Sequence, residues 1–477
     1  MREIHFLLRI ENKSMIMSAE NPVVPGVRET TRPSLRSDFS WTLVGNAVYA
    51  GGQFATLMLL AKLLSPELVG QYALGLALVY PVMMFTNLQL RAVMSSGSRQ
   101  NTHFGNFLGL RLLTTSLALA IVFAVTQILG YGRELTTVVL MVGLAYGVET
   151  LSDVYYARLQ LHDRMAEISK SMIARALLSV LCLAVVTFLV RSLLWGVAAI
   201  VLARLIVFFG YDVRERTHGL SRQSNWLSNN AALSPRFDPK ALRELLWVSL
   251  PLGIVVLLGC LNASIPTFFI EHALGERDVG IFAAIGFMVS VGNMAVVSLG
   301  QAAFTRLARS CATGSLRAFS SLVGKLLFFG AAIGASGMTI SKLAGHEILT
   351  LVFRPEYAEQ AGLLTWIMAA GGVLFMAQFL GFALTAANFY HSQVALNIAA
   401  NLGLLVACYW LVERRGLLGA VLAMLVGAIV QLGGSIIVLV IGMRKRSQAL
   451  AERVAAPNLI GSVSVSGGRG VALNGGD

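Results

Sequence analysis

The sequence predicts an all-α polytopic membrane protein with about 12 transmembrane helices, arranged as two parallel six-helix halves. Hydrophobic residues make up 56% of the chain and charged residues only 13%, a balance far from that of soluble domains. Long runs carry no charge, among them residues 245–270 and 360–412. A helix crosses the hydrocarbon core with about 20 apolar residues, so such runs predict helical spans. A β-barrel would instead show short alternating segments.

The individual spans follow from these runs and from the charged residues that separate them. Arg175, Arg204 and Lys325 interrupt the fifth, sixth and ninth spans, and the last long run divides into adjacent hairpins. The predicted spans are residues 41–63, 70–90, 106–129, 135–155, 168–190, 193–211, 244–269, 279–301, 321–342, 361–384, 391–412 and 416–442.

Positive charge predicts the orientation of the spans. The formal net charge is +13, and 26 of the 37 Lys and Arg residues fall on the side that holds both termini. Cytoplasmic segments are enriched in Lys and Arg, so both termini are predicted to be cytoplasmic. The domain prediction is a cytoplasmic tail (1–40), a six-helix half (41–211), a basic linker (212–243), a second half (244–442) and a cytoplasmic tail (443–477).

An internal repeat supports this division. A shift of 210 positions places residues 64–73 over residues 274–283, and the match continues without a gap to Arg99 over Arg309. Each half has an even number of predicted spans, so the copies have the same topology and relate by an axis along the membrane normal. Transporters built in this way bind their substrate between the halves.

Residues 41–99 resemble a known family. The Asn46 span, the turn Leu-Leu-Ser-Pro-Glu-Leu-Val-Gly (63–70), the following Tyr-Ala-Leu and the exit at Arg91 are similar to the start of polysaccharide transporters, the O-antigen and exopolysaccharide flippases. These belong to the multidrug/oligosaccharidyl-lipid/polysaccharide exporter superfamily. The resemblance implies that an undecaprenyl-diphosphate-linked oligosaccharide is flipped from the inner to the outer leaflet of a bacterial cytoplasmic membrane. It also implies glycosyltransferases and a polysaccharide polymerase as possible partners.

Three arginines are the candidate substrate-binding cations. A diphosphate in hydrocarbon needs cations that face a wet cavity. Arg204 lies seven residues before the end of the sixth span, roughly 10 Å deep. Arg111 and Arg175 lie nearer the inner ends of their spans, where extension to the lipid headgroups is the alternative to a substrate role.

Glu149 and Asp153 are the candidate acids. They are four residues apart, on one face of the fourth span. They are predicted to bind a coupling ion, or to alternate with substrate phosphate at Arg204. The alternative is a fixed ion pair that holds the fourth and sixth spans together.

Glycine and proline mark the first span of each half. Gly51 and Gly52 lie in one, and Pro251 and Pro266 in the other, so both spans are candidates for gating; ordinary helix packing is the alternative. Asn262 is a candidate substrate ligand. Further amides could line a sugar cavity or bond neighbouring helices: Asn87, Asn293, Gln301, Gln378, Asn397, Asn401 and Gln431.

Other classes of protein are less consistent with the sequence. There is no P-loop, no cluster with metal-ligand spacing and no basic module for nucleic acid, so the expectation is a transporter without catalytic residues, metal or cofactor. A drug/cation antiporter should place acids within the first span of each half, where this chain embeds none, although Glu149 and Asp153 keep this class open. A peptidoglycan-precursor flippase should be more cationic in its first half. A glycan polymerase or ligase should have a large external loop, whereas all predicted external connections are short.

Overall fold

The computed structural model describes residues 35–95, 103–214, 234–313 and 315–455. Residues 1–34 of the predicted N-terminal tail, most of the linker and the end of the C-terminal tail lie outside these residues. The first half contains α2 (Leu35–Leu63), α3 (Pro66–Asn87), α4 (Leu90–Ser95), α5 (Phe104–Ile128), α6 (Arg133–Leu161), α7 (Met165–Val190), α8 (Leu193–Val207) and the π-helix η1 (Phe208–Asp212). The second half contains α10 (Pro239–Leu274), α11 (Glu276–Gly286), α12 (Met288–Ala312), α13 (Leu316–Val352), α14 (Pro355–Ala358), α15 (Ala361–Ala386) and α16 (Tyr390–Ala455).

The predicted membrane spans are all present as helices. Within the described ranges, 11 helical stretches are long and apolar enough to cross a membrane. The last of them, His391–Arg444, is broken at Gly416, whose φ of 59° and ψ of −137° end one helix and begin another. Counting both sides of Gly416 accounts for the twelve predicted spans and confirms the fold class.

Local sequence explains where several helices begin and end. Pro66 and Pro239 occupy first-turn positions of α3 and α10, where their missing N–H groups leave no hydrogen bond unmade. The Asp238 carboxylate accepts the backbone N–H of Lys240 at 3.1 Å and caps α10. Gly275, with φ of 90°, separates α10 from α11. These short corners keep consecutive helices antiparallel.

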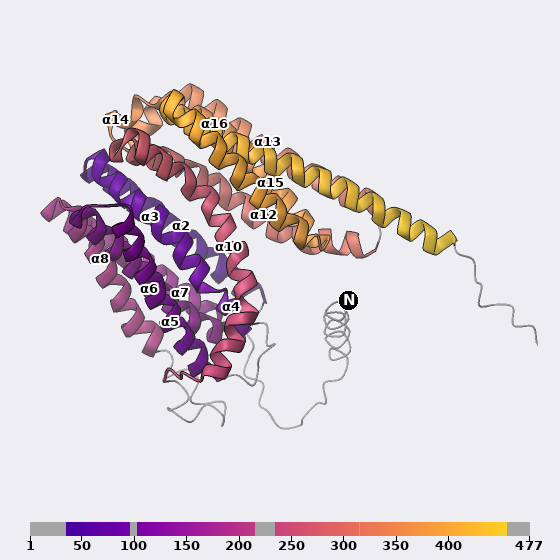
Figure 1. Ribbon diagram of the computed structural model, residues 1–477, viewed down its shortest axis with the longest axis horizontal. Coiled ribbons are helices and arrows are strands. Elements are labelled where there is room, and N and C mark those ends of the chain that lie inside the picture. The colour runs from indigo at the N-terminus through magenta and orange to yellow at the C-terminus, as the bar shows by residue number, and fades with distance from the viewer. Residues whose placement is uncertain (1–34, 96–102, 215–233, 314, 456–477) are drawn as a thin grey trace, which may run out of the picture.

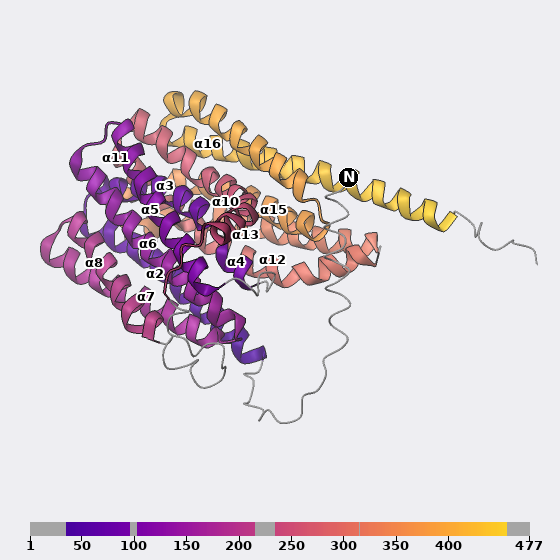
Figure 2. The ribbon, with the colours of Figure 1, turned by 60° about the horizontal axis from the view of Figure 1, so that its bottom comes forward.

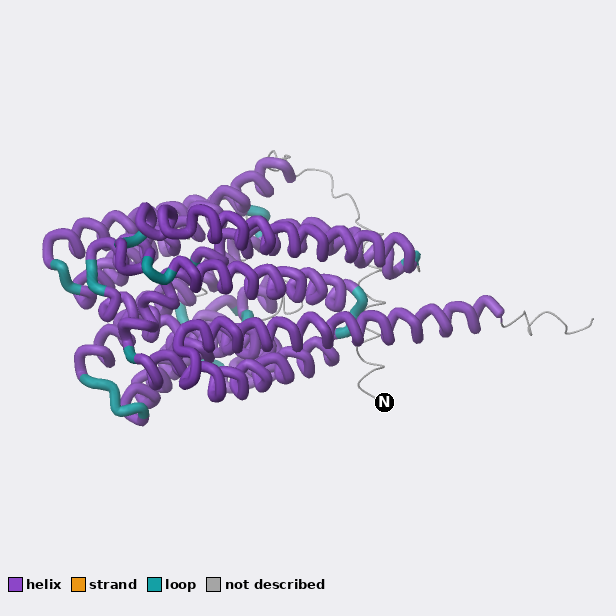
Figure 3. Tube along the Cα trace, turned by 90° about the horizontal axis from the view of Figure 1, so that it is seen from above, coloured by secondary structure: helices purple, strands orange, loops and turns teal. Residues whose placement is uncertain are grey.

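The helices form two bundles that are inclined to each other (Figure 1). Helices α2 to α8 lie in one bundle, and α12 to α16 in the other, while the first part of α10 follows the first bundle (Figures 1 and 2). Viewed from above, every described regular element is a helix, and the last part of α16 extends beyond the bundles (Figure 3). Between the bundles, α3 packs against α10 and α11.

The apolar core is shared by the halves at one end of the molecule and divided at the other. The largest buried cluster unites both halves around the connections α2–α3, α10–α11 and α14, with Leu60, Val69, Val279 and Tyr357 among its members. We call this the closed end. At the other end, which we call the terminal end, the cluster around Leu307 and Phe379, formed by α12, α13, α15 and α16, is separate from the cluster around Phe107, which joins the first half to Leu245 at the beginning of α10.

Candidate functional site

Arg204 and Glu149 form an ion pair inside the first half. The guanidinium of Arg204 on α8 donates to Glu149 Oε2 on α6 at 2.7 Å and to the Ala145 carbonyl at 2.9 Å. The Tyr49 hydroxyl on α2 donates to the other carboxylate oxygen, and Gln53 donates to that hydroxyl at 2.9 Å. The side chains of Arg204 and Glu149 are 8% and 20% exposed. Both charges are therefore largely out of solvent, and they connect α2, α6 and α8.

Arg175 on α7 belongs to a second buried network. It donates to Asp212 Oδ2 and to the Tyr156 hydroxyl, each at 2.9 Å. Ser152 and Ser171 donate to the two oxygens of Asp212 at 2.7 and 2.5 Å. The Arg175 and Asp212 side chains are 2% and 1% exposed. Three side chains thus donate to one carboxylate, as a buried charge requires.

Asp212 was missed by the sequence reasoning, which placed it as the first residue of the linker. The structure instead places Asp212 at the end of η1, a π-helical turn that continues the sixth span beyond the end of α8 at Val207. The sequence carries one indication of this position. Asp212 directly follows the apolar span that contains Arg204, and the neighbouring span contains Arg175, so an acid is available to pair with a buried arginine.

Arg111 on α5 is completely buried at the end of α3. Its guanidinium donates to the Asn87 carbonyl at 2.9 Å and to Asn87 Oδ1 at 2.8 Å. The Asn87 amide donates to Asp153 at 3.3 Å, and Asp153 also faces Arg91 at 3.8 Å. Asp153 is therefore not a partner of Arg204, although it lies one helical turn from Glu149.

The idea that Arg111 and Arg175 extend to the lipid headgroups is wrong for this structure. Both guanidinium groups point into the half and are bonded to protein atoms. An apolar stretch of sequence shows how deep a residue lies in the membrane but not the direction in which its side chain points. Buried Asn87 and Asp212 supply partners that make inward burial possible.

A small cavity lies between two of the arginine groups. It has a volume of about 20 Å³ and is lined by Arg175, Arg204, Tyr49, Gln53 and Tyr72 among others. The Nε atoms of Arg175 and Arg204 are buried and have no protein hydrogen-bond partner among the described residues. A cavity of this size has room for about one water molecule. The Arg175 and Arg204 networks are therefore adjacent inside the first half.

The candidate gating residues have different surroundings. A Cβ on Gly52 would lie 2.9 Å from the Ala176 Cβ, so Gly52 permits close packing of α2 on α7, whereas Gly51 faces open space. Pro251 is exposed and Pro266 is buried, and α10 continues through both. Packing explains Gly52, and a gating role for all four residues stays a prediction.

The closest contact between the halves repeats itself across the 210-residue offset. A Cβ on Gly70 of α3 would overlap the carbonyl oxygen of Glu276, and a Cβ on Gly280 of α11 would overlap the carbonyl oxygen of Pro66. Positions 66 and 70 correspond to 276 and 280 in the repeat, so the contact is reciprocal. The backbones of α3 and α11 cross on the axis that relates the halves.

Asn262 does not join the arginines. It lines a cavity of about 630 Å³ inside the second half, and none of the three arginines lines that cavity. Asn293, Gln378, Asn397, Asn401 and Gln431 also line it, whereas Asn87 bonds Arg111 and Gln301 is exposed elsewhere on α12. The predicted substrate ligands therefore form two separate groups, one in each half.

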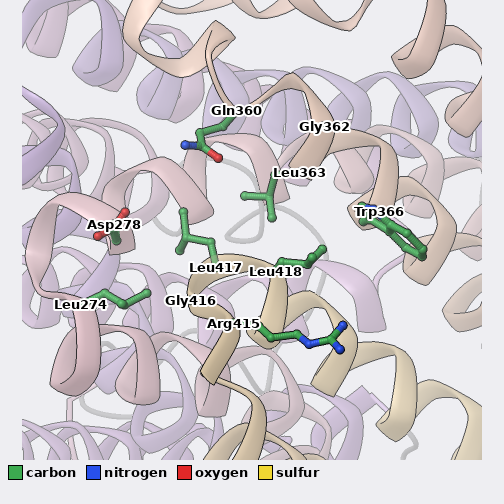
Figure 4. Close-up of a pocket in the computed structure, with 10 residues that line it drawn as sticks. All are labelled: Leu274, Asp278, Gln360, Gly362, Leu363, Trp366, Arg415, Gly416, Leu417 and Leu418. Carbon is green, nitrogen blue, oxygen red and sulfur yellow. The ribbon is translucent and has the colours of Figure 1, made fainter. Parts of the chain in front are cut away.

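Another pocket, of about 490 Å³, lies at the closed end where α10, α15 and the Gly416 turn meet (Figure 4). Asp278 and Arg415 both line it, but the Arg415 side chain points away from Asp278 (Figure 4). No described salt bridge joins them, and the pocket lacks the convergent polar groups of the other two.

Comparison with known proteins decides the family. The sequence profile described as polysaccharide biosynthesis protein matches residues 35–310. The chain belongs to this polysaccharide biosynthesis family. The match confirms the resemblance that residues 41–99 carry, and extends it into α12 of the second half.

Relatives of this family member agree with that assignment. A capsular polysaccharide biosynthesis protein of Staphylococcus aureus, CapF, is 26% identical over 402 residues, which is 83% of this chain and 96% of the relative. The inward closed lipid II flippase MurJ superposes with a TM-score of 0.68 at 10% identity, over 89% of this chain and 94% of that one.

Two transporter structures share the fold as well. An inward-facing multidrug resistance transporter of the MATE family gives a TM-score of 0.60 at 13% identity, over 87% of this chain and 95% of that chain. A superfamily transporter from Pyrococcus furiosus gives 0.58 at 14% identity, over 90% and 100%. At these identities the likeness establishes the fold alone.

Proposed function

We propose that this chain is a flippase that moves an undecaprenyl-diphosphate-linked oligosaccharide from the inner to the outer leaflet of a bacterial cytoplasmic membrane. The transported glycan would enter surface polysaccharide synthesis. The glycosyltransferases that build it and a polymerase that extends it are the expected partners. Support comes from the family, from the name of the staphylococcal relative and from the fold shared with a lipid II flippase.

The observation that carries the proposal is the unequal joining of the halves. One apolar cluster holds both halves together at the closed end, while at the terminal end the cluster of α12, α13, α15 and α16 is separate from the first-half cluster, which includes only the beginning of α10 from the second half. With both termini in the cytoplasm, as the distribution of Lys and Arg predicts, the terminal end faces the leaflet on which the lipid-linked oligosaccharide is made. Alternating access then requires that the closed end separate while the terminal end joins.

The Arg204–Glu149 pair is the proposed site at which the substrate diphosphate and a coupling proton or cation bind. A diphosphate that reached Arg204 would compete with Glu149 for the guanidinium, and a freed Glu149 carboxylate could take up a proton or cation. Tyr49 and Gln53 hold the carboxylate from α2, so its release would also loosen α2 from α6. This couples the pair to a movement of the first span.

The alternatives are a drug/cation antiporter and a glycan polymerase. Glu149, the acid that would serve an antiporter, is already occupied by Arg204 and Tyr49. For a polymerase, the described connections at the closed end leave little room for a catalytic loop; the longest runs from Phe353 to Gln360 and contains α14. Both features favour a transporter of a large headgroup.

Deletion of the gene tests the proposal. We expect lipid-linked oligosaccharide to accumulate in the inner leaflet, where it is shielded from a membrane-impermeant glycosidase added outside spheroplasts. Unpolymerised units in the outer leaflet would instead establish a polymerase. Unchanged glycolipid together with increased drug accumulation would establish an antiporter.

A further inference from the structure

The cavity in the second half has a wall of uncharged hydrogen-bonding groups. Helices α10, α11, α12, α15 and α16 all contribute to it. Seven amides line the space of about 630 Å³, namely Asn262, Asn293, Gln378, Gln393, Asn397, Asn401 and Gln431. No Asp, Glu, Lys, Arg or His is among its lining residues. The polar side chains therefore come from α10, α12, α15 and α16, and none of them is charged.

Several amide oxygens on this wall lack a hydrogen-bond donor. The Asn401 amide donates to the Leu258 carbonyl at 2.7 Å, which fixes its orientation, and its oxygen has no partner among the described residues. Asn401 is only 8% exposed. The side-chain oxygens of Asn293 and Gln378 are also buried without a hydrogen-bond partner among the described residues. An acceptor out of water without a donor is destabilising, so the wall calls for a ligand rich in O–H or N–H groups.

Aromatic rings cover the remaining sides of the cavity. Phe282, Phe375 and Phe382 line it together with the amides. A pyranose ring has the matching character, with hydroxyl groups around its edge and apolar C–H groups on its faces. Binding sites in general combine apolar walls with a few convergent polar groups in this way. The absence of charge in the lining makes it unsuitable for a diphosphate or a cation, which would need counter-charges.

We infer that this cavity is a binding subsite for uncharged sugar residues in the headgroup of the transported lipid. The inference rests on the proposed function and deepens it, because it assigns the glycan to the second half and leaves the diphosphate outside the cavity. The amides hold hydroxyl groups, and the phenylalanine rings pack on sugar faces.

The test is a binding comparison of two lipids on the full chain in detergent. One is the glycolipid extracted from cells that lack the gene; the other is synthetic undecaprenyl diphosphate without sugar. Gly259→Met fills the cavity, since Gly259 lines it and a Cβ there meets no atom within 4 Å. Gly324→Met is the matched control, because Gly324 on α13 is equally open and lies outside the lining.

A second pair of variants removes the amide without adding volume. Gln378→Met deletes one orphaned acceptor, and Gln301→Met makes the same change on an exposed surface of α12. We expect Gly259→Met and Gln378→Met to weaken binding of the glycolipid about tenfold while binding of undecaprenyl diphosphate is unchanged. The two controls should behave like the wild type, and thermal unfolding checks that all four variants are folded.

The outcomes separate the inference from the proposed function. Loss confined to the glycolipid and to the two cavity variants supports the subsite. Equal binding of both lipids by the wild type, undiminished glycolipid binding by the cavity variants, or an equal loss for both lipids overturns it, and leaves the flippase proposal standing. No accumulation of glycolipid in the deleted cells, or no binding of either lipid by the wild type, overturns the flippase proposal itself.

Discussion

The two halves are both built of helices but have different polar interiors. All buried charged side chains among the described residues belong to the first half, namely Arg111, Arg158, Arg175, Arg204 and Asp212. In the second half, the buried polar residues are uncharged and the principal cavity is lined by amides. The repeat therefore preserves the positions at which helices cross, while the chemistry between the helices has diverged.

This difference has a physical basis. A charge buried in a membrane protein needs a fixed partner, so arginines come in tightly bonded groups that also hold helices together. A neutral amide that lacks a partner costs less than an unpaired charge, so amides can surround a cavity. The first half is consequently suited to charge, and the second to neutral ligands.

Among single substitutions in the two halves, removal of the Arg204 side chain should have the largest effect on glycan export. We expect Arg204→Ala to abolish glycan export while the protein still inserts, because Glu149 loses its counter-charge and the substrate loses a cation. Export of surface polysaccharide by a deletion strain that carries the variant is the measurement. Near-normal export at normal expression would refute the assignment. The double change Arg204→Met with Glu149→Met separates the roles, since a purely structural pair would be replaceable by two apolar side chains.

Breaking the Arg175 network should lower stability most. Asp212→Ala leaves a guanidinium that is 2% exposed without its carboxylate, and we expect the free energy of unfolding to fall by about 3–5 kcal/mol. Chemical denaturation in detergent measures this. The matched change in the second half, Asn401→Ala, breaks one neutral hydrogen bond and should cost about 1 kcal/mol. Equal losses at the two sites would remove the distinction between the halves.

The crossing of α3 and α11 should respond equally from both sides. Gly70→Ala and Gly280→Ala each push a methyl group into a backbone carbonyl of the other half, and we expect each to cost about 1–3 kcal/mol. Gly51→Ala is the control, since its Cβ meets nothing within 4 Å and alanine favours a helix. Thermal unfolding of the three variants checks the expectation, and unequal shifts at positions 70 and 280 would contradict the symmetry.

The exposed ion pair between the halves should contribute least. Arg277 and Glu67 approach to 3.7 Å with side chains 58% and 49% exposed. Solvent screens such a pair, so Arg277→Ala should change stability by less than about 1 kcal/mol. The same unfolding measurement tests it, and a change as large as that at Gly280 would mean that charge, rather than backbone packing, holds the closed end.

The fold could be predicted from the sequence because apolar runs longer than a membrane crossing permit few alternatives. Even the turn at Gly416 follows, since Glu413, Arg414 and Arg415 separate two uncharged runs that are each long enough for a span. The link between Arg204 and Glu149 was also accessible, because few charges occur within the spans. Both inferences use depth along a helix, which sequence provides.

What the sequence could not provide was the direction of each side chain around its helix. For Arg111 and Arg175 the sequence leaves extension to the lipid headgroups open, and only packing shows that they face Asn87 and Asp212. Asn262 was grouped with the arginines because all are polar and embedded, although it lies in the other half. The packing alone shows that the Asn401 amide donates to the Leu258 carbonyl and that the Asn401 oxygen has no donor among the described residues.

The reciprocal crossing at Gly70 and Gly280 is the form of contact that a symmetric pair of identical chains makes, in which each partner presents the same patch. In such a pair, one glycine codon would supply both positions, and every mutation would appear twice. A pair of identical chains could not place arginines in one copy and amides in the other. Joining the two copies in one gene lifts that restriction, so buried charges in one half and an amide-lined cavity in the other are open to the fused chain but not to a pair of identical chains.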